Sequence, residues 1–363
     1  MIHYKLSTKH TSITTLLKTK TKGNQKMTEE MTPNVDLYTR NGFAGPITTV
    51  IRPTYTPNYL RADGEYVSKT INIFDVKSSD KHTLSTPILE SMDTVFEVTN
   101  LSSDMDYAIR NVYADEIHIC LAGSATLATD FGELDVEPGD IIHISRSVSY
   151  KLKNITKPIT ILKLVSESEL KIAPDHVPGV LNPDLDVHAP TPVNNPSDKP
   201  KEHEVVIRHK DGTTSFFYDA DPMQCLDVIG ISPVSKFNLE NVHGLGCRQG
   251  LVLPPLLIDD KSTRTLIYHM GDREVGRPPI HHNADYDEII VYVKGPGQYG
   301  EITAPGTLAF TPKGLVHQGP LENVPEGYQA ILFETRSSLT MTEAFQNVAS
   351  PMDMDHYGKR KDA

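Results

Sequence analysis

The stretch "RPPIHHNADYDEIIVYVKG", residues 277–295, places two histidines and three acids at the start of an apolar run. The run is rich in β-branched residues and ends at a glycine, as expected of a buried strand. Burying ionisable side chains beside a core is costly unless another group compensates them. A metal ion is one of the few partners that uses histidine and glutamate together, so this stretch predicts a metal site on a β-strand.

The first half of the chain repeats this pattern. "HNADYDEIIVYVKG" (282–295) and "PGTLAFTPKGLVH" (305–317) correspond to "RNVYADEIHICLAG" (110–123) and "PGDIIHISRSVSY" (138–150). In both halves a glutamate precedes a glycine by seven residues, and a strand that begins with Pro-Gly ends twelve residues after the proline. Other short apolar runs are separated by Gly, Pro, Asn and Asp. The repeat therefore predicts an all-β protein with two related barrels.

Composition restricts the class of protein. A chain of 363 residues can hold one large or two medium domains, and its net charge of −12 argues against nucleic acid as a partner. No apolar run approaches the roughly 18 residues that span a membrane. Three cysteines without a CxxC pair favour a reducing compartment. We therefore expect a cytoplasmic protein with no nucleic-acid or membrane partner.

The domain organisation follows from changes in composition along the chain. The first segment is rich in lysine and contains no acid, which is typical of a disordered extension or of a start assigned too early, with Met27 as the true start. Proline recurs in a later segment without any apolar period, as in an interdomain connection. The expected units are an extension (1–26), an N-terminal barrel without metal (27–172), a proline-rich connection (173–202), a C-terminal catalytic barrel (203–350) and a tail (351–363).

The repeated elements resemble the two conserved motifs of the cupin superfamily, in which His, Glu and Gly are followed by Pro-Gly, a strand and a final His. Two copies imply a bicupin, that is, two jelly-roll barrels, with short helices at the C-terminal end. In the second copy the resemblance places metal ligands at His282, Glu288 and His317. His281 directly precedes His282 and points to the opposite face of a strand, so we expect it on the surface or behind the ligands.

In the first copy the three ligand positions are Arg110, Glu116 and Tyr150. A guanidinium cannot ligate a cation, so we expect this barrel to hold no metal and Glu116 to pair with Arg110.

Two imidazoles and one carboxylate form a facial triad that leaves other coordination positions open, as favoured by non-haem Fe(II) enzymes. Fe(2+) is therefore the expected cofactor. Zinc is the main rival, because His₂Glu sites also hold catalytic zinc. Alternatively, the histidines could simply hydrogen-bond within the core.

A narrower resemblance rests on several segments that occur in order. They are "DVIGISPVSKFNLENV" (227–242), "RPPIHHN" followed by "DE", then "HQGP", and "FETRSSLTMTEA". Together they resemble the homogentisate 1,2-dioxygenase group, and most closely the large subunits of hydroquinone 1,2-dioxygenase. The resemblance implies an Fe(II)-dependent, extradiol-type dioxygenase of aromatic catabolism that cleaves a para-dihydroxybenzene, with hydroquinone giving 4-hydroxymuconic semialdehyde. It also implies a smaller, related partner subunit, or a homo-oligomer.

The chain departs from homogentisate dioxygenase in its catalytic residues. The family histidine expected about eleven residues past Asn241 has no counterpart, and His243 and His269 are the nearby candidates for the proton acceptor. Tyr299 is displaced by two residues from the family tyrosine. The catalytic candidates are His243, His269 and Tyr299, and the substrate-binding candidates are Arg248, Tyr299 and Gln318.

Two other functions fit the same ligands. The chain could be a homogentisate 1,2-dioxygenase itself, or a zinc or manganese bicupin that acts as a decarboxylase or isomerase. A non-catalytic bicupin that only binds a small molecule would need no metal.

Overall fold

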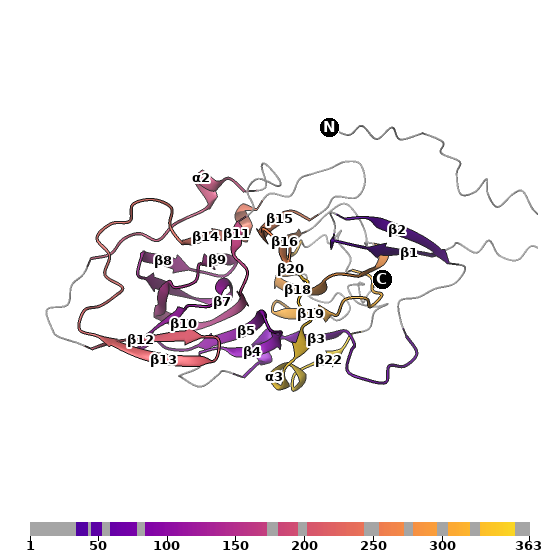
Figure 1. Ribbon diagram of the computed structural model, residues 1–363, viewed down its shortest axis with the longest axis horizontal. Helices are drawn as coiled ribbons and strands as arrows, with labels where there is room; N and C mark the ends of the chain where they lie inside the picture. Colours follow the sequence, from indigo (N-terminus) through magenta and orange to yellow (C-terminus); the bar gives the residue numbers. More distant parts are fainter. Residues whose placement is uncertain are drawn as a thin grey trace, which may run out of the picture.

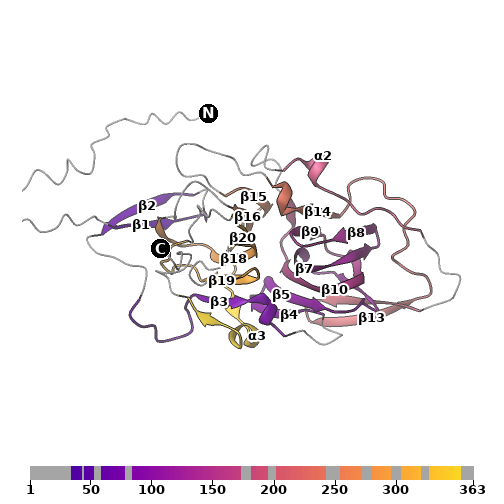
Figure 2. The same ribbon diagram turned by 180° about the vertical axis from the view of Figure 1, so that it is seen from behind.

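The computed structural model describes residues 34–42, 45–52, 59–77, 84–172, 181–194, 202–242, 254–271, 279–295, 304–319 and 327–352. Two β-rich lobes lie side by side, and a hairpin lies on the outer flank of the second lobe (Figures 1 and 2). The strand pairing confirms the expected all-β fold and divides it between two lobes. No helix in this part of the chain is long and apolar enough to cross a membrane.

The first lobe is an 11-stranded sheet. Its strands are β4 (Thr86–Glu90), β5 (Thr94–Leu101), β6 (Ala108–Asn111), β7 (Asp115–Thr129), β8 (Gly132–Val136), β9 (Asp140–Ile144), β10 (Ser149–Ser166), β12 (His203–His209), β13 (Gly212–Tyr218), β14 (Val234–Asn238) and β21 (Thr340–Met341).

The second lobe is an eight-stranded sheet, and a three-stranded sheet lies on its flank. The eight strands are β3 (Lys69–Asn72), β11 (Leu170–Ile172), β15 (Leu256–Asp260), β16 (Thr265–Gly271), β18 (Asp287–Lys294), β19 (Thr307–Thr311), β20 (Gln329–Thr335) and β22 (Ser350–Pro351). The flanking sheet contains β1 (Asn34–Thr39), β2 (Ile47–Arg52) and β17 (Ile280–Asn283). The helices are short: α2 (Pro183–Asp186), α3 (Glu343–Gln346), and the 3₁₀ turns Ile73–Asp75 and Leu239–Asn241.

The two halves of the chain exchange strands. β3 precedes the first lobe in sequence but pairs with β19 of the second, and β14 precedes the second lobe but pairs with β9 of the first. β11 likewise pairs with β15, and β21 pairs with β4. The hairpin β12–β13 follows the expected connection and yet extends the first lobe through β6. Strand pairing therefore crosses the domain boundary expected at 173–202, and neither half completes its sheet alone.

Strand alternation separates three apolar clusters. Along β7, Ile117 and Ile119 face the second lobe, and along β18, Ile289 and Val291 face the first, so a single cluster fills the space between the lobes. The opposite faces of the same strands line two separate interiors, one in each barrel. Long-range apolar burial thus joins the lobes into one unit.

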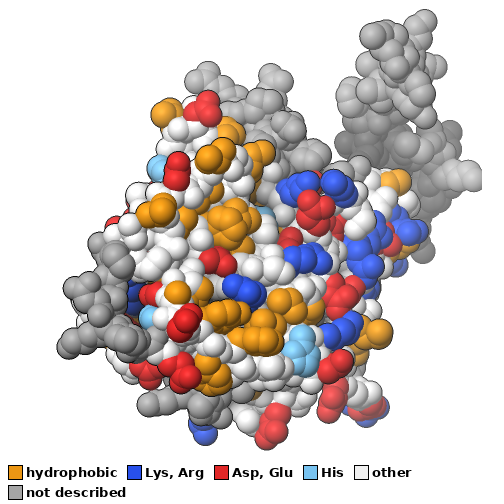
Figure 3. Space-filling view, turned by 60° about the vertical axis from the view of Figure 1, so that its left-hand side comes forward, with side chains coloured by type: hydrophobic (Ala, Val, Ile, Leu, Met, Phe, Trp, Pro, Cys, Tyr) orange, Lys and Arg blue, Asp and Glu red, His pale blue; other side chains and the backbone are white. Residues whose placement is uncertain are grey.

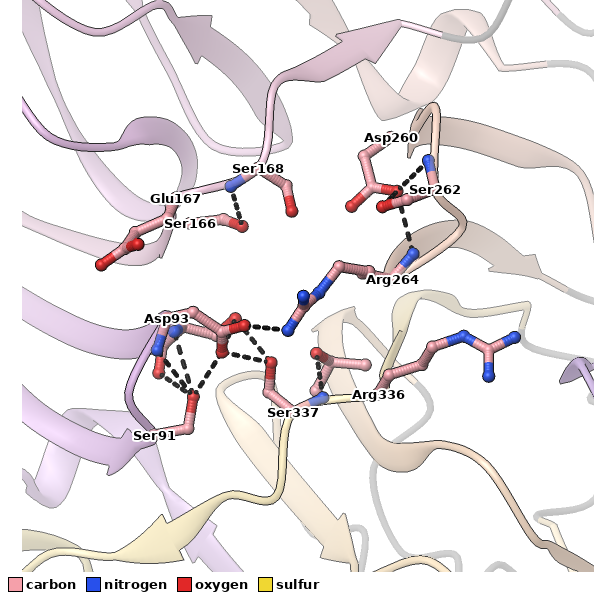
Figure 4. Close-up of polar contacts among 12 residues, drawn as sticks. Ser91, Asp93, Ser166, Glu167, Ser168, Asp260, Ser262, Arg264, Arg336 and Ser337 are labelled. Carbon is pink, nitrogen blue, oxygen red and sulfur yellow. Dashed lines mark hydrogen bonds and ion pairs between the residues drawn. The ribbon is translucent and has the colours of Figure 1, made fainter.

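Polar contacts also join the two lobes, as Figure 4 shows. Asp93, in the turn between β4 and β5, accepts hydrogen bonds from the hydroxyls of Ser337 (2.6 Å) and Ser91 (3.0 Å) and pairs with the guanidinium of Arg264. Arg264 in turn donates its amide N–H to Asp260 (2.9 Å), which holds the β15–β16 turn. Burial raises the pKa of Asp93, but these hydroxyls and the Arg264 charge outweigh it, and the net pKa is lowered.

Apolar residues are also present at the surface. The face in Figure 3 shows apolar, acidic and basic side chains interspersed. All residues of β13 are exposed, including Phe216 at 45% and Phe217 at 57%. Apolar residues that remain exposed contribute less to stability than buried ones.

Replacement of Phe96 should show that the buried cluster between the lobes contributes more to stability than the exposed residues of β13. Phe96 is fully buried, and its ring meets that of Phe333 edge-on across the lobes at 5.2 Å. We expect Phe96→Ala to lower the free energy of unfolding by about 3–5 kcal/mol in urea titrations, because it leaves a cavity at the lobe boundary. The exposed control Phe216→Ala should change it by no more than about 0.5 kcal/mol. Equal effects of the two variants would contradict this description of the core.

Candidate metal centre

Two histidines are held side by side by an isolated antiparallel bridge. His281 lies in β17, and His317 lies in the segment after β19. The amide N–H of each donates to the carbonyl oxygen of the other, both at 2.9 Å. Directly opposed residues of a bridge place their side chains on the same face, and the imidazole centroids lie 4.3 Å apart. The backbone therefore sets the spacing of the two rings.

The backbone also fixes the tautomer of both rings. The Nδ1 atom of His281 lies 3.0 Å from the carbonyl oxygen of Pro279, and that of His317 lies 3.0 Å from the carbonyl oxygen of Leu315. A carbonyl can only accept, so each Nδ1 carries the proton and each neutral ring presents its Nε2 lone pair. This is the arrangement of metal-ligating histidines. The Nε2 atom of His317 is buried and makes no hydrogen bond.

Glu288 completes a cluster of three ligand-type residues. It lies second in β18, and its carboxylate oxygen Oε1 is 3.4 Å from Nε2 of His317. One ligand atom from each of His281, Glu288 and His317 can be chosen so that all lie within 4.8 Å of one another. The unbonded Nε2 atom of His317 and the set of two histidines and one glutamate fit a divalent metal with open coordination positions.

Asp287 anchors the neighbouring segments. Its carboxylate accepts the amide N–H of Lys313 (2.9 Å) and that of Leu339 (2.8 Å), which ties the strand of Glu288 to the loop that leads to His317. Sequence reasoning missed this residue. The available signal was the Asp-Glu pair that both halves share, at 115–116 and 287–288.

The structure corrects the expected histidine ligand. His281, not His282, joins Glu288 and His317. The His282 ring meets Tyr38 edge-on at 5.3 Å between centroids, and its Nδ1 lies 3.5 Å from Asp36 of β1. The expectation counted residues back from Glu288, but the face of each histidine is set by the pairing of β17 with His317 and with β1.

Charge within the cluster is coupled. Burial, and then the proximity of His317, lower the pKa of His281 to about 4, so this ring is neutral at pH 7. Burial opposes the charged form of His317, but Glu288 outweighs it and raises the pKa. Burial would likewise raise the pKa of Glu288, but His317 lowers it. A histidine must be neutral to ligate a metal, so the raised pKa of His317 means that metal affinity should fall in acid.

The interior beside the cluster is aromatic and contains a second acid. Glu334 shares a face of β20 with Ala330 and Leu332, which line the second barrel. Burial, and then the charge of Glu288, raise the pKa of Glu334 to about 8. Glu334 therefore carries a proton at pH 7. The lining includes Tyr268, Tyr286, Tyr292 and Tyr328.

The other expected site residues have different outcomes. Gln318 follows His317 and is half-buried. His269 lies on β16 between Tyr268 and Met270, both of which face the barrel interior, so its side chain lies on the opposite face of the strand. The structure therefore does not place His269 with the cluster, and its role as a base stays a prediction. His243, Arg248 and Tyr299 lie outside the described residues.

The equivalent position in the first lobe is filled by protein groups. Glu116 accepts hydrogen bonds from Asn111 (2.9 Å) and Tyr150 (2.8 Å), and its Oε2 lies 2.6 Å from the His118 ring. The Lys163 ammonium donates to the Tyr150 hydroxyl (3.2 Å). The cluster contains no set of three metal-ligating side chains.

Arg110 does not pair with Glu116, contrary to expectation. Its Nε donates to the hydroxyl of Ser149 at 2.7 Å, and its Nη2 lies 3.6 Å from Asp130. Arg110 lies in β6 one residue before Asn111, whose side chain does reach Glu116. Alternation along the strand therefore directs the guanidinium elsewhere.

Comparison with known proteins gives a remote relationship. No protein-family model matches the chain. A protein of Saccharolobus solfataricus, whose name provisionally calls it a dioxygenase, is 24% identical over 322 residues, which cover 80% of this chain and 82% of the relative.

Solved structures resemble the chain in outline. A cupin conserved-barrel-domain protein from Leptotrichia buccalis has a TM-score of 0.46 and 13% identity, and the match covers 74% of this chain and 97% of that one. A mutant of Bacillus subtilis oxalate decarboxylase has a TM-score of 0.39 and 10% identity, with 77% and 80% covered. At these values the fold assignment rests on the strand pairing described above.

Replacement of each neighbouring histidine should identify the ligand. We expect His281→Ala to weaken Co²⁺ binding to the metal-free protein by more than about 100-fold, because direct loss of a ligand exceeds the roughly 10–100-fold cost of losing an outer partner. His282→Ala should leave the affinity essentially unchanged. Calorimetric titration of both variants measures this. A larger loss of affinity in His282→Ala than in His281→Ala would instead support His282 as the ligand.

Glu334 should make stability depend on pH. Its pKa rises from 4.5 to about 8 on folding. Between these values the unfolded chain loses the proton while the folded protein keeps it, so stability falls by about 1.4 kcal/mol per pH unit. Glu334→Gln lacks this titration. In urea titrations of the metal-free protein, its stability relative to the parent should therefore rise from pH 5 to pH 8. A constant difference would show that the folded-state pKa is ordinary.

Proposed function

We propose that this protein is an Fe(II)-dependent dioxygenase that cleaves the ring of a para-dihydroxybenzene, with hydroquinone as the preferred substrate. The observation that carries the proposal is the convergence of His281, Glu288 and His317 within 4.8 Å. The relative from Saccharolobus solfataricus, with its provisional dioxygenase name, supports the same reaction class.

The donor set determines what a bound metal could do. A facial triad leaves coordination positions for both substrate and dioxygen, which favours iron over closed zinc sites. When bound, Fe²⁺ supplies a Lewis acid that lowers the pKa of a coordinated phenol and a centre at which dioxygen can react. His281 contributes a neutral ligand, and Glu288 contributes the negative charge.

The lining of the second barrel favours an uncharged aromatic diol. Tyrosine and aliphatic side chains surround the interior, and no buried Lys or Arg occurs among the described residues of this lobe. The carboxylate of homogentisate would find no buried Lys or Arg as a counter-charge among these residues. Hydroquinone needs only hydrogen-bond partners, which Glu334 and the tyrosines can supply.

The proposed reaction is balanced without a further reductant. The bond between a hydroxylated ring carbon of hydroquinone and its neighbour breaks, and both atoms of dioxygen enter 4-hydroxymuconic semialdehyde. The hydroxylated carbon becomes a carboxylic acid, and its neighbour becomes an aldehyde. Because His269 faces away from the interior, His243 is our candidate for the acceptor of the phenolic proton.

Oxygen uptake tests the proposal. We expect the chain, loaded anaerobically with Fe²⁺, to consume dioxygen with hydroquinone, and Glu288→Gln to abolish uptake. Uptake with homogentisate alone would assign the protein to the homogentisate branch instead. Iron binding without oxygen uptake, even with a smaller related subunit added, would favour a non-oxidative decarboxylase or isomerase. Failure to bind iron would refute the proposal.

A further inference from the structure

Asn283 lies between the two buried carboxyl groups of the second barrel. Its amide nitrogen Nδ2 is 3.1 Å from Oε2 of Glu288 and 3.5 Å from Oε1 of Glu334. All three residues are buried, with at most 6% of each residue exposed. A hydrogen bond to a carboxylate is strong when water is excluded, so Asn283 restrains the oxygen of Glu288 that does not contact His317.

The restraint requires that the amide face the right way. If the Asn283 side chain turned over, its oxygen would meet a carboxylate oxygen and the two would repel. Thr39 prevents this, because its hydroxyl lies 2.7 Å from Oδ1 of Asn283 and can donate to it. Thr39 is 8% exposed, so water does not readily replace it.

Thr39 reaches this position from the N-terminal strand. β1 runs parallel to β17 with Thr39 opposite Asn283, and the carbonyl oxygen of Thr39 accepts the amide N–H of Ala284 at 3.1 Å. Backbone pairing thus holds the hydroxyl against the amide. The contact joins residues 244 positions apart in the chain.

In the first lobe an asparagine also donates to the site glutamate, but different groups orient its amide. There, Nδ2 of Asn111 donates to Glu116 at 2.9 Å, and Oδ1 of Asn111 accepts the amide N–H groups of Tyr113 and Ala114, both at 3.2 Å. The asparagine and its bond to glutamate recur in both halves. In the second lobe the amide oxygen accepts a hydrogen bond from a hydroxyl on a distant strand. In the first lobe it accepts hydrogen bonds from the local backbone.

We infer that Thr39 and Asn283 are positioning residues that orient the Glu288 carboxylate toward the point where His281 and His317 converge. The N-terminal strand is then part of the metal centre, although it supplies no ligand. The inference rests on the proposed metal site but not on its reaction or substrate, and it concerns the affinity and geometry of the bound ion.

Co²⁺ titration of the metal-free full chain tests the inference. The affinity and the visible absorption bands of bound Co²⁺ report the number and arrangement of ligands. We expect Thr39→Val, which keeps the side-chain volume, to weaken Co²⁺ binding about tenfold and to change the absorption bands. The reason is that the Asn283 amide loses the hydrogen bond that orients it. Asn283→Ala should weaken binding by about 10–100-fold. Thr39→Ser keeps the hydroxyl and should restore the parent behaviour.

The matched control is Thr49→Val, in the exposed part of β2 within the same hairpin. It should bind Co²⁺ as the parent does. If the parent binds no Co²⁺, the metal site itself is refuted. If the parent binds and Thr39→Val matches it in affinity and bands, the positioning role is refuted. Should Thr39→Val fail to fold, Asn283→Ala decides, and parent-like binding by that variant overturns the inference.

Discussion

A buried aspartate that precedes the site glutamate holds the surrounding segments together. Asp287 accepts the amide N–H groups of Lys313 and Leu339, so one carboxylate joins the start of β18, the loop before His317 and the segment after β20. Asp115 accepts two equivalent amides in the first lobe, at 3.0 and 2.9 Å. Leaving such amides unpaired in a core would cost about 1–3 kcal/mol each. Glutamate and histidine can therefore meet only where this anchor places them, and the same anchor directs the following strand toward the other lobe.

That redirection makes the two lobes interdependent. β11 and β21 leave their own barrels immediately after the anchored segments and pair with the opposite lobe, while β3 and β14 make the reciprocal exchange at the other end. The metal centre depends on a distant strand as well, because β17 pairs along its length with β1 and meets its own half through the bridge between His281 and His317. A barrel of this kind cut from the chain would lose strands that it does not encode. The first lobe is thus part of the scaffold that shapes the second.

The sequence predicts those features that depend on residue type and repeat spacing. The all-β class, the paired barrels and two of the three clustered residues, Glu288 and His317, could be read in this way. The choice between His281 and His282 could not, because adjacent residues on a strand face opposite sides and the pairing partner decides which side is inward. β1, which contributes that pairing, is separated from β17 by most of the chain. A usable signal existed in Asn111 and Asn283, which each precede a glutamate by five residues and so mark the inward face.

The two site glutamates differ in which groups satisfy their oxygens. Glu116 lies at hydrogen-bonding distance from Asn111, Tyr150 and His118. The buried Lys163 ammonium donates to the hydroxyl of Tyr150, which in turn donates to Glu116. Its charge is neutralised by the protein, so a metal would gain little there and would have to displace those bonds. Glu288 also contacts an asparagine, but no described residue supplies it with such a cation, and its facing histidine ring offers an unbonded nitrogen. A buried carboxylate beside an unpaired nitrogen is costly in a metal-free protein. A divalent ion could therefore satisfy the groups of the second lobe, whereas protein side chains already surround the corresponding glutamate of the first lobe.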